Sequence, residues 1–114
     1  MNRRGAALVV MVAAVALLAL PGVASAADPP EIPLTIENQK FQPAEVKVKA
    51  GIPFVLVITN KNAAAAEFES KELRVEKVIP AGKTLKVRIR ALKAGTYPFL
   101  DDFHQQTTGR IVAE

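Results

Sequence analysis

Residues 45–59 read EVKVKAGIPFVLVIT, and this stretch decides the class of fold. In its first part, Val46 and Val48 alternate with charged residues, which is the period of two of a β-strand with one buried face. Gly51 and Pro53 then interrupt the pattern as a turn. The run FVLVIT that follows is apolar at successive positions, as in a strand covered on both faces. The stretch therefore predicts two strands joined by a turn, the second of them central in its sheet.

The same alternation recurs through most of the remaining chain. In IPLTIE, residues 32–37, every second residue is apolar, and KTLKVRIRAL, residues 83–92, repeats the pattern with basic residues between. Proline, glycine and asparagine turns separate these segments from LRVEKVI, TYPF and GRIVAE. Roughly seven or eight short strands of this kind predict an all-β fold, a Greek-key β-sandwich. The alanine run 63–66 is expected to be a loop, and no helix is expected beyond the first 26 residues.

The N-terminal segment has the order of regions found in a signal peptide. Two arginines precede an apolar run from Ala6 to Leu20, and the small-residue pattern ASA ends at Ala26. The alternative is an uncleaved membrane anchor, but the apolar run is shorter than the roughly 20 residues that span a bilayer. We therefore expect a signal peptide at residues 1–26, cleaved after Ala26, and a periplasmic or secreted domain at residues 27–114 without a membrane span.

Composition excludes some classes of protein. The chain has no cysteine, so the exported domain must be stabilised by packing without disulfides. Two of the 15 basic residues would leave with the signal peptide, which leaves 13 against 11 acidic residues. The basic row along residues 83–90 lacks the interleaved aromatic side chains that single-strand binders use for stacking. Nucleic acid is therefore not an expected partner.

Carboxylates and one histidine near two predicted strand ends form a candidate metal site. EFES and DDFH supply five donors: Glu67, Glu69, Asp101, Asp102 and His104, the last being the only histidine of the chain. The two glutamates lie on one face of a strand because side chains alternate. Oxygen ligands with one imidazole suit Cu(II), Fe(II), Fe(III), Mn(II) or Zn(II). The alternative is that His104 closes a strand end by a hydrogen bond and that the acids are solvated.

Several motifs together resemble one known family. They are FQPAEVKVKAGIPFVLVITNKN, EFES, VIPAGKTLKVRI, LKAGTYPFLDDFH and GRIVAE, in this order between Ile32 and Glu114. They look like the cupredoxin-like domains of secreted bacterial proteins, a group related to the EfeO-type iron-uptake cupredoxins. The resemblance implies a cupredoxin-like β-sandwich over residues 27–114.

The resemblance also implies where a metal would be bound. Blue-copper cupredoxins use an early histidine, a Cys-x-x-His loop and a methionine. In this chain Glu67 takes the place of the early histidine, Asp101 that of the cysteine and His104 that of the loop histidine. The methionine has no counterpart, since both methionines lie in the first 26 residues. A blue-copper centre is therefore not expected, because it needs two imidazoles and a thiolate.

Relatives that this sequence resembles commonly carry an acidic residue directly before Phe-His, which favours Asp102 over Asp101 as a ligand. The resemblance thus implies Glu67, Asp102 and His104 as direct ligands, with Glu69 and Asp101 as supporting or alternative ligands. Cu(II) is the expected cofactor, and iron is the second candidate.

Two functions agree with these features. In the first, which the resemblance implies, the protein is exported, binds Cu(II) or iron, and assists a membrane iron-permease system in Fe(II) oxidation or metal delivery. In the second, it is a metal-free β-sandwich that binds another protein, with the acidic turn in the contact. A stand-alone hydrolytic enzyme is not expected, because no Ser or Cys nucleophile accompanies His104 in a recognisable motif.

Overall fold

A computed structural model describes residues 27–114, and the predicted signal peptide lies outside the described residues. This part of the chain forms strands and turns, without an α-helix. The strands are β1 (Glu31–Glu37), β2 (Lys40–Gln42), β3 (Glu45–Val48), β4 (Phe54–Asn60), β5 (Ala66–Ser70), β6 (Val75–Ile79), β7 (Thr84–Ile89), β8 (Gly95–Asp101) and β9 (His104–Ala113). Within residues 27–114 no helix of the length and apolar character needed to cross a membrane is present.

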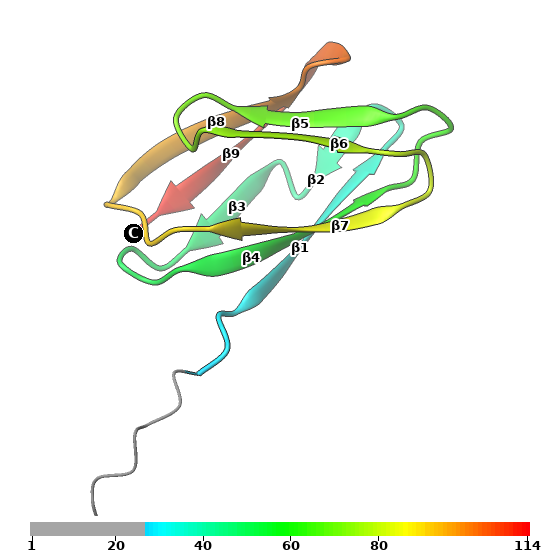
Figure 1. The fold of residues 1–114 in the computed structure, drawn as a ribbon. Coiled ribbons are helices and arrows are strands. Elements are labelled where there is room, and N and C mark those ends of the chain that lie inside the picture. Colours follow the sequence, from blue (N-terminus) through cyan, green and yellow to red (C-terminus); the bar gives the residue numbers. More distant parts are fainter. Residues whose placement is uncertain (1–26) are drawn as a thin grey trace, which may run out of the picture.

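The strands form two sheets that pack face to face (Figure 1). The four-stranded sheet has the order β2-β1-β4-β7, and the five-stranded sheet has the order β3-β9-β8-β5-β6. β1 pairs parallel with β4 and β3 pairs parallel with β9, whereas the other neighbours are antiparallel. The chain passes from one sheet to the other between β2 and β3, β3 and β4, β4 and β5, β6 and β7, and β7 and β8. The predicted all-β sandwich is confirmed.

The core lies between the two sheets and is apolar. β4 lies between β1 and β7, and its Leu56 and Ile58 are fully buried, which confirms the predicted central strand. Three aromatic rings, those of Phe41, Phe68 and Phe99, meet in the core with ring centroids 4.8 to 6.3 Å apart. Such edge-on and tilted pairs stabilise a core beyond their buried area. Packing of this kind replaces the disulfides that the chain lacks.

The C-terminal strand is longer than the sequence pattern predicts. β9 begins at His104 and runs through QQTT, so the polar stretch after β8 is a tight hairpin with Asp102 and Phe103 at its turn. The hairpin, orange in Figure 1, projects at one end of the sandwich. Thr107 is buried in β9 because its hydroxyl donates to the carbonyl of Gln39, at 2.6 Å. This hydrogen bond joins the added part of β9 to the turn between β1 and β2.

Smaller differences concern the borders of two other strands. The alanine run is a loop as predicted except for its last residue, Ala66, which begins β5 and is buried. β6 begins only at Val75, because Leu73 is buried within the turn before it and Arg74 has a positive φ of 55°. The backbone of Leu73 accepts a hydrogen bond from Arg90, which holds this turn against the end of β7.

Candidate metal centre

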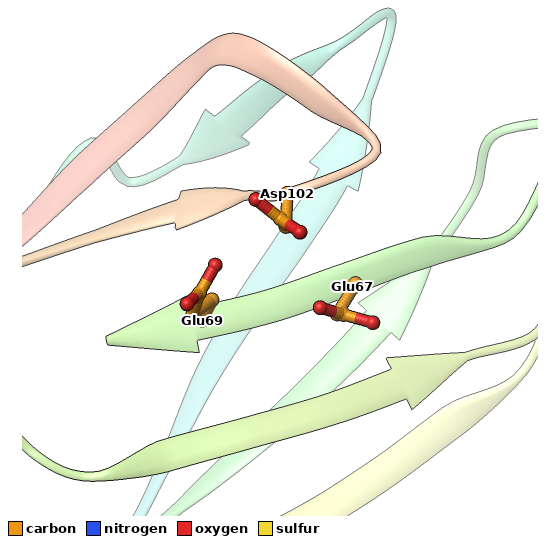
Figure 2. Close-up of side chains that lie close together, drawn as sticks. All are labelled: Glu67, Glu69 and Asp102. Atoms are coloured by element: carbon orange, nitrogen blue, oxygen red, sulfur yellow. The ribbon is translucent and has the colours of Figure 1, made fainter. Parts of the chain in front are cut away.

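Three carboxylates gather on the outer face of the five-stranded sheet, at the end that carries the β8–β9 hairpin. Each of Glu67, Glu69 and Asp102 offers an oxygen that lies within 4.8 Å of the other two. Glu69 and Asp102 are partly buried, and Glu67 is only 9% exposed. Figure 2 shows the two glutamates projecting from β5 with Asp102 beside them. The group therefore contains three of the five predicted site residues.

Strand alternation and one backbone hydrogen bond explain how the group forms. Ala66, Phe68 and Ser70 of β5 point into the protein, so the two glutamates between them must point outward. β8 pairs with β5 through Glu69 and Leu100, which brings the end of β8 beside the glutamates. The amide of Asp102 then donates to the carbonyl oxygen of Glu67, at 2.8 Å. This hydrogen bond fixes Asp102 next to β5.

The negative charges in this region repel one another. The pKa of Glu67 is raised above its ordinary value by partial desolvation, by a hydrogen bond with Glu76, and by the charges of Glu76, Asp102 and Glu69. The pKa of Glu69 is raised by desolvation and by Asp102 and Glu76, while Lys71 opposes the shift. A cation bound among these oxygens would relieve the repulsion and displace the protons that the raised pKa values favour.

Glu76 is a neighbour of the site that the sequence did not reveal. It lies on β6 directly opposite Glu69 in the strand pairing. In the sequence Glu76 is one of several charged residues in a short alternating segment, and nothing there marks it as special. Only the register of β6 against β5 places it beside the two glutamates, since a shift by one residue would move it to the other face.

The remaining two predicted residues, Asp101 and His104, form a separate pair. They lie opposite each other across the hairpin, and Asp101 shares its inward face with Phe68. The Nδ1 atom of His104 lies 3.0 Å from Oδ2 of Asp101. Asp101 is fully buried, whereas the His104 side chain is 34% exposed. His104 is not a member of the three-carboxylate group.

The donors present do not fit a blue-copper centre. The chain has no cysteine, and its two methionines are outside residues 27–114. Asp101 and His104 are close enough to share a metal, but among the described residues no third His, Cys, Asp or Glu joins them. The outer-face group supplies carboxylate oxygens alone, which suit hard cations and Cu(II) rather than Cu(I).

A groove of about 510 Å³ adjoins the carboxylates on the same outer face. It opens where β5 and β8 diverge, since these strands pair only at two positions. Beyond that point the hydroxyl of Ser70 donates to the carbonyl of Pro98, at 2.8 Å, in place of a strand-to-strand hydrogen bond. The residues around the groove include Glu69, Ser70, Lys71, Pro98, Leu100 and Arg110. Because Glu69 belongs to both features, a ligand in the groove would contact the edge of the carboxylate group.

Solved structures of low sequence identity share this architecture. The metal-binding domain of the Cu(I)-exporting P-type ATPase CopA of Streptococcus pneumoniae D39, solved with Cu(I), superposes with a TM-score of 0.65 at 16% identity, covering 74% of this chain and 84% of that one. Auracyanin A, a blue copper protein of Chloroflexus aurantiacus, gives 0.63 at 16% identity, covering 75% and 99%. A purple cupredoxin of Nitrosopumilus maritimus gives 0.56 at 13% identity, covering 72% and 98%. The class of protein is thus a cupredoxin-type β-sandwich.

Sequence comparison gives the family. The profile of the cupredoxin-like domain matches residues 8–113, so the chain belongs to the cupredoxin-like domain family. An uncharacterized protein of Rickettsia prowazekii (strain Madrid E) is 35% identical over 77 residues. That match covers 68% of this chain but only 62% of the relative.

Proposed function

We propose that this protein is an exported cupredoxin-like metal-binding protein that holds Cu(II) or iron on Glu67, Glu69 and Asp102. The observation that carries the proposal is the approach of three carboxylates to within 4.8 Å on one face of the sheet. Two of them have raised pKa values because of partial desolvation and their neighbours' charges. Such a group gains stability when a cation replaces the repulsion with attraction.

Donor chemistry ranks the candidate cations. Among divalent first-row ions, oxygen and nitrogen sites generally bind Cu(II) most tightly, so Cu(II) is the first candidate. Carboxylate oxygens also suit iron in either oxidation state, which keeps iron as the second candidate. The three side chains would hold the ion and leave further coordination positions to water or to a ligand in the adjoining groove.

Export and a membrane partner complete the proposal. The signal-peptide pattern that ends at Ala26 supports export, and the resemblance to iron-uptake cupredoxins supports an iron-permease system as the partner. Expression of the full chain in a bacterial host tests the first point. The processed protein should appear outside the cytoplasm with residue 27 at its N-terminus, and an unprocessed cytoplasmic product would contradict export.

Calorimetric titration of purified residues 27–114 tests metal binding itself. Cu(II) is expected to bind with a stoichiometry of one and to raise the unfolding temperature as its concentration rises above the dissociation constant. Fe(II) is titrated in parallel without oxygen. The ion with the lower dissociation constant is the one that the site prefers. Absence of saturable binding for both ions would reject the proposal.

One set of observations favours the alternative, a metal-free module that binds another protein. Val78 on β6 lies opposite Glu67, Phe103 directly follows Asp102, and both apolar side chains are 50% exposed. Exposed apolar side chains beside a charged group are typical of a protein interface. The titration separates the two functions, because the module predicts no saturable metal binding at the three carboxylates.

A further inference from the structure

Asp101 is a fully buried carboxylate with a complete set of hydrogen-bond donors. Its Oδ1 accepts from the amide of Glu67, at 2.9 Å, and from the amide of Phe103, at 3.1 Å. Its Oδ2 faces Nδ1 of His104, at 3.0 Å. A buried charge is costly unless it is paired and hydrogen-bonded, and these contacts meet that requirement.

These hydrogen bonds join three parts of the fold. Glu67 belongs to β5, Phe103 to the hairpin turn, and His104 to the beginning of β9. Phe68 and Asp101 form one of only two residue pairs between β5 and β8, so the paired stretch of these strands is short. The Asp101 carboxylate therefore joins the projecting hairpin to β5, next to the backbone hydrogen bond from Asp102 to Glu67.

The contact also determines which nitrogen of His104 carries a proton. An ionised carboxylate can only accept hydrogen bonds, so the ring must donate from Nδ1. A metal at Nδ1 would displace that proton and leave Oδ2 of buried Asp101 without its donor. The resemblance assigns Asp101 and His104 to two copper-ligand positions, yet their interaction with each other is already satisfied.

We infer that Asp101 and His104 form a metal-independent clasp that fastens the β8–β9 hairpin to β5 at the position where the cupredoxin resemblance places copper. A cation at Nδ1 of His104 would have to break the clasp, whereas Nε2 of the ring takes no part in it. The clasp is independent of the proposed function, because it requires no metal at Glu67, Glu69 and Asp102.

Thermal unfolding of residues 27–114 in the presence of a strong chelator tests the clasp. Asp101→Asn is expected to lower the unfolding temperature by on the order of 10 °C, because the buried site loses its charge-assisted hydrogen bond to the ring. His104→Ala should lower it by roughly 5 °C. Gln106→Ala, an exposed residue of the same strand, serves as the control and should change it by less than about 2 °C. The chelator itself should leave the parent unchanged.

Two spectra test which ring nitrogen of His104 carries the proton. Nitrogen-15 NMR of the parent in chelator at alkaline pH should show a proton on Nδ1. In the spectrum of Asp101→Asn the proton should move to Nε2, because the amide nitrogen of Asn can donate to Nδ1. If neither substitution lowers the unfolding temperature, if Nδ1 is unprotonated, or if Asp101→Asn leaves the position of the proton unchanged, the clasp is wrong. None of these results depends on whether the outer-face carboxylates bind a cation, so the two proposals fail separately.

Discussion

Glu67 and Glu69 are held beside other carboxylates, and this arrangement makes the stability of the metal-free protein depend on pH. Both pKa values are raised in the folded protein above the ordinary value of 4.5. As pH falls from neutral towards 4.5, the folded protein therefore takes up protons before the unfolded chain does. The contribution of these two residues to the free energy of unfolding must then increase, because the proton is bound more tightly in the folded state.

The corresponding measurement is a series of chemical unfolding experiments between pH 7.5 and 4.5 in chelator. We expect the parent to gain stability relative to the double variant Glu67→Gln/Glu69→Gln as the pH is lowered through this range. The amides keep the shape of the side chains but cannot titrate. If the free energy of unfolding changed with pH in the same way for both proteins, the pKa values of these glutamates would not be raised in the folded state.

Gly109 shows how closely the aromatic core is packed. It lies opposite Phe99 in the β8–β9 pairing, and a Cβ atom at this position would overlap the Phe99 ring and lie 3.0 Å from the carbonyl oxygen of Ala44. Gly109→Ala is therefore expected to lower the free energy of unfolding by roughly 2 kcal/mol or more. In the double variant Phe99→Leu/Gly109→Ala the smaller side chain makes room, so the combined loss should be less than the sum of the single losses. Additive losses would mean that the ring and the methyl group do not compete.

Asn60 connects strands from the two sheets at one end of the sandwich. It is the last residue of β4, and its Nδ2 donates to the carbonyls of Ala64 and Ile79, at 2.9 and 3.0 Å. Its Oδ1 accepts from the amide of Asn62, at 3.0 Å. The fully buried side chain thus holds the loop before β5 and the end of β6 against β4.

Replacing this amide should destabilise the fold, because it removes a buried hydrogen bond to the carbonyl of Ile79 and the two partly buried ones to Ala64 and Asn62. Asn60→Ala is expected to cost roughly 3 kcal/mol of unfolding free energy in denaturant titration. The neighbouring Thr59 makes a single exposed hydrogen bond to Thr84, so Thr59→Ala serves as the control and should cost less than about 1 kcal/mol. Equal losses for the two variants would contradict a special role for Asn60.

The hairpin between β8 and β9 shows what strand patterns can and cannot predict. Alternation correctly predicted that the two glutamates of β5 share a face, because every second side chain points the same way. It could not predict that only Asp102 and Phe103 of DDFH form the turn, since turn length depends on local backbone geometry. That turn places His104 opposite Asp101 and leaves Asp102 with the glutamates. A change of one residue in the register would exchange the members of the two groups.

The whole sandwich could be predicted as a class but not in its connections. Short alternating strands and turn residues are enough to predict two packed antiparallel layers. They do not identify the neighbours of each strand, and the parallel pairings of β1 with β4 and of β3 with β9 follow only from the tertiary structure. The position of Glu76 beside the carboxylate group depends on the antiparallel register of β6 against β5, which the sequence pattern does not fix.

The architecture also explains how a cupredoxin-like domain without a blue-copper ligand set can keep its fold. The two sheets enclose one apolar core, and the end of the sandwich is closed by hydrogen bonds of Asp101. The outer face is free to carry charged groups, because it contributes little to that core. Metal binding on this face would therefore be added to a fold that is already stable without it.

Paired calorimetric titrations of Cu(II) into Glu69→Gln and Glu72→Gln test the central claim most directly. Glu69 belongs to the carboxylate group, whereas Glu72 is an exposed carboxylate in the next turn outside that group. Loss of one charged ligand is expected to weaken binding at least tenfold in Glu69→Gln, which is about 1.4 kcal/mol. Glu72→Gln should bind as the parent does. Equal affinities of the two variants would show that copper does not bind at Glu67, Glu69 and Asp102.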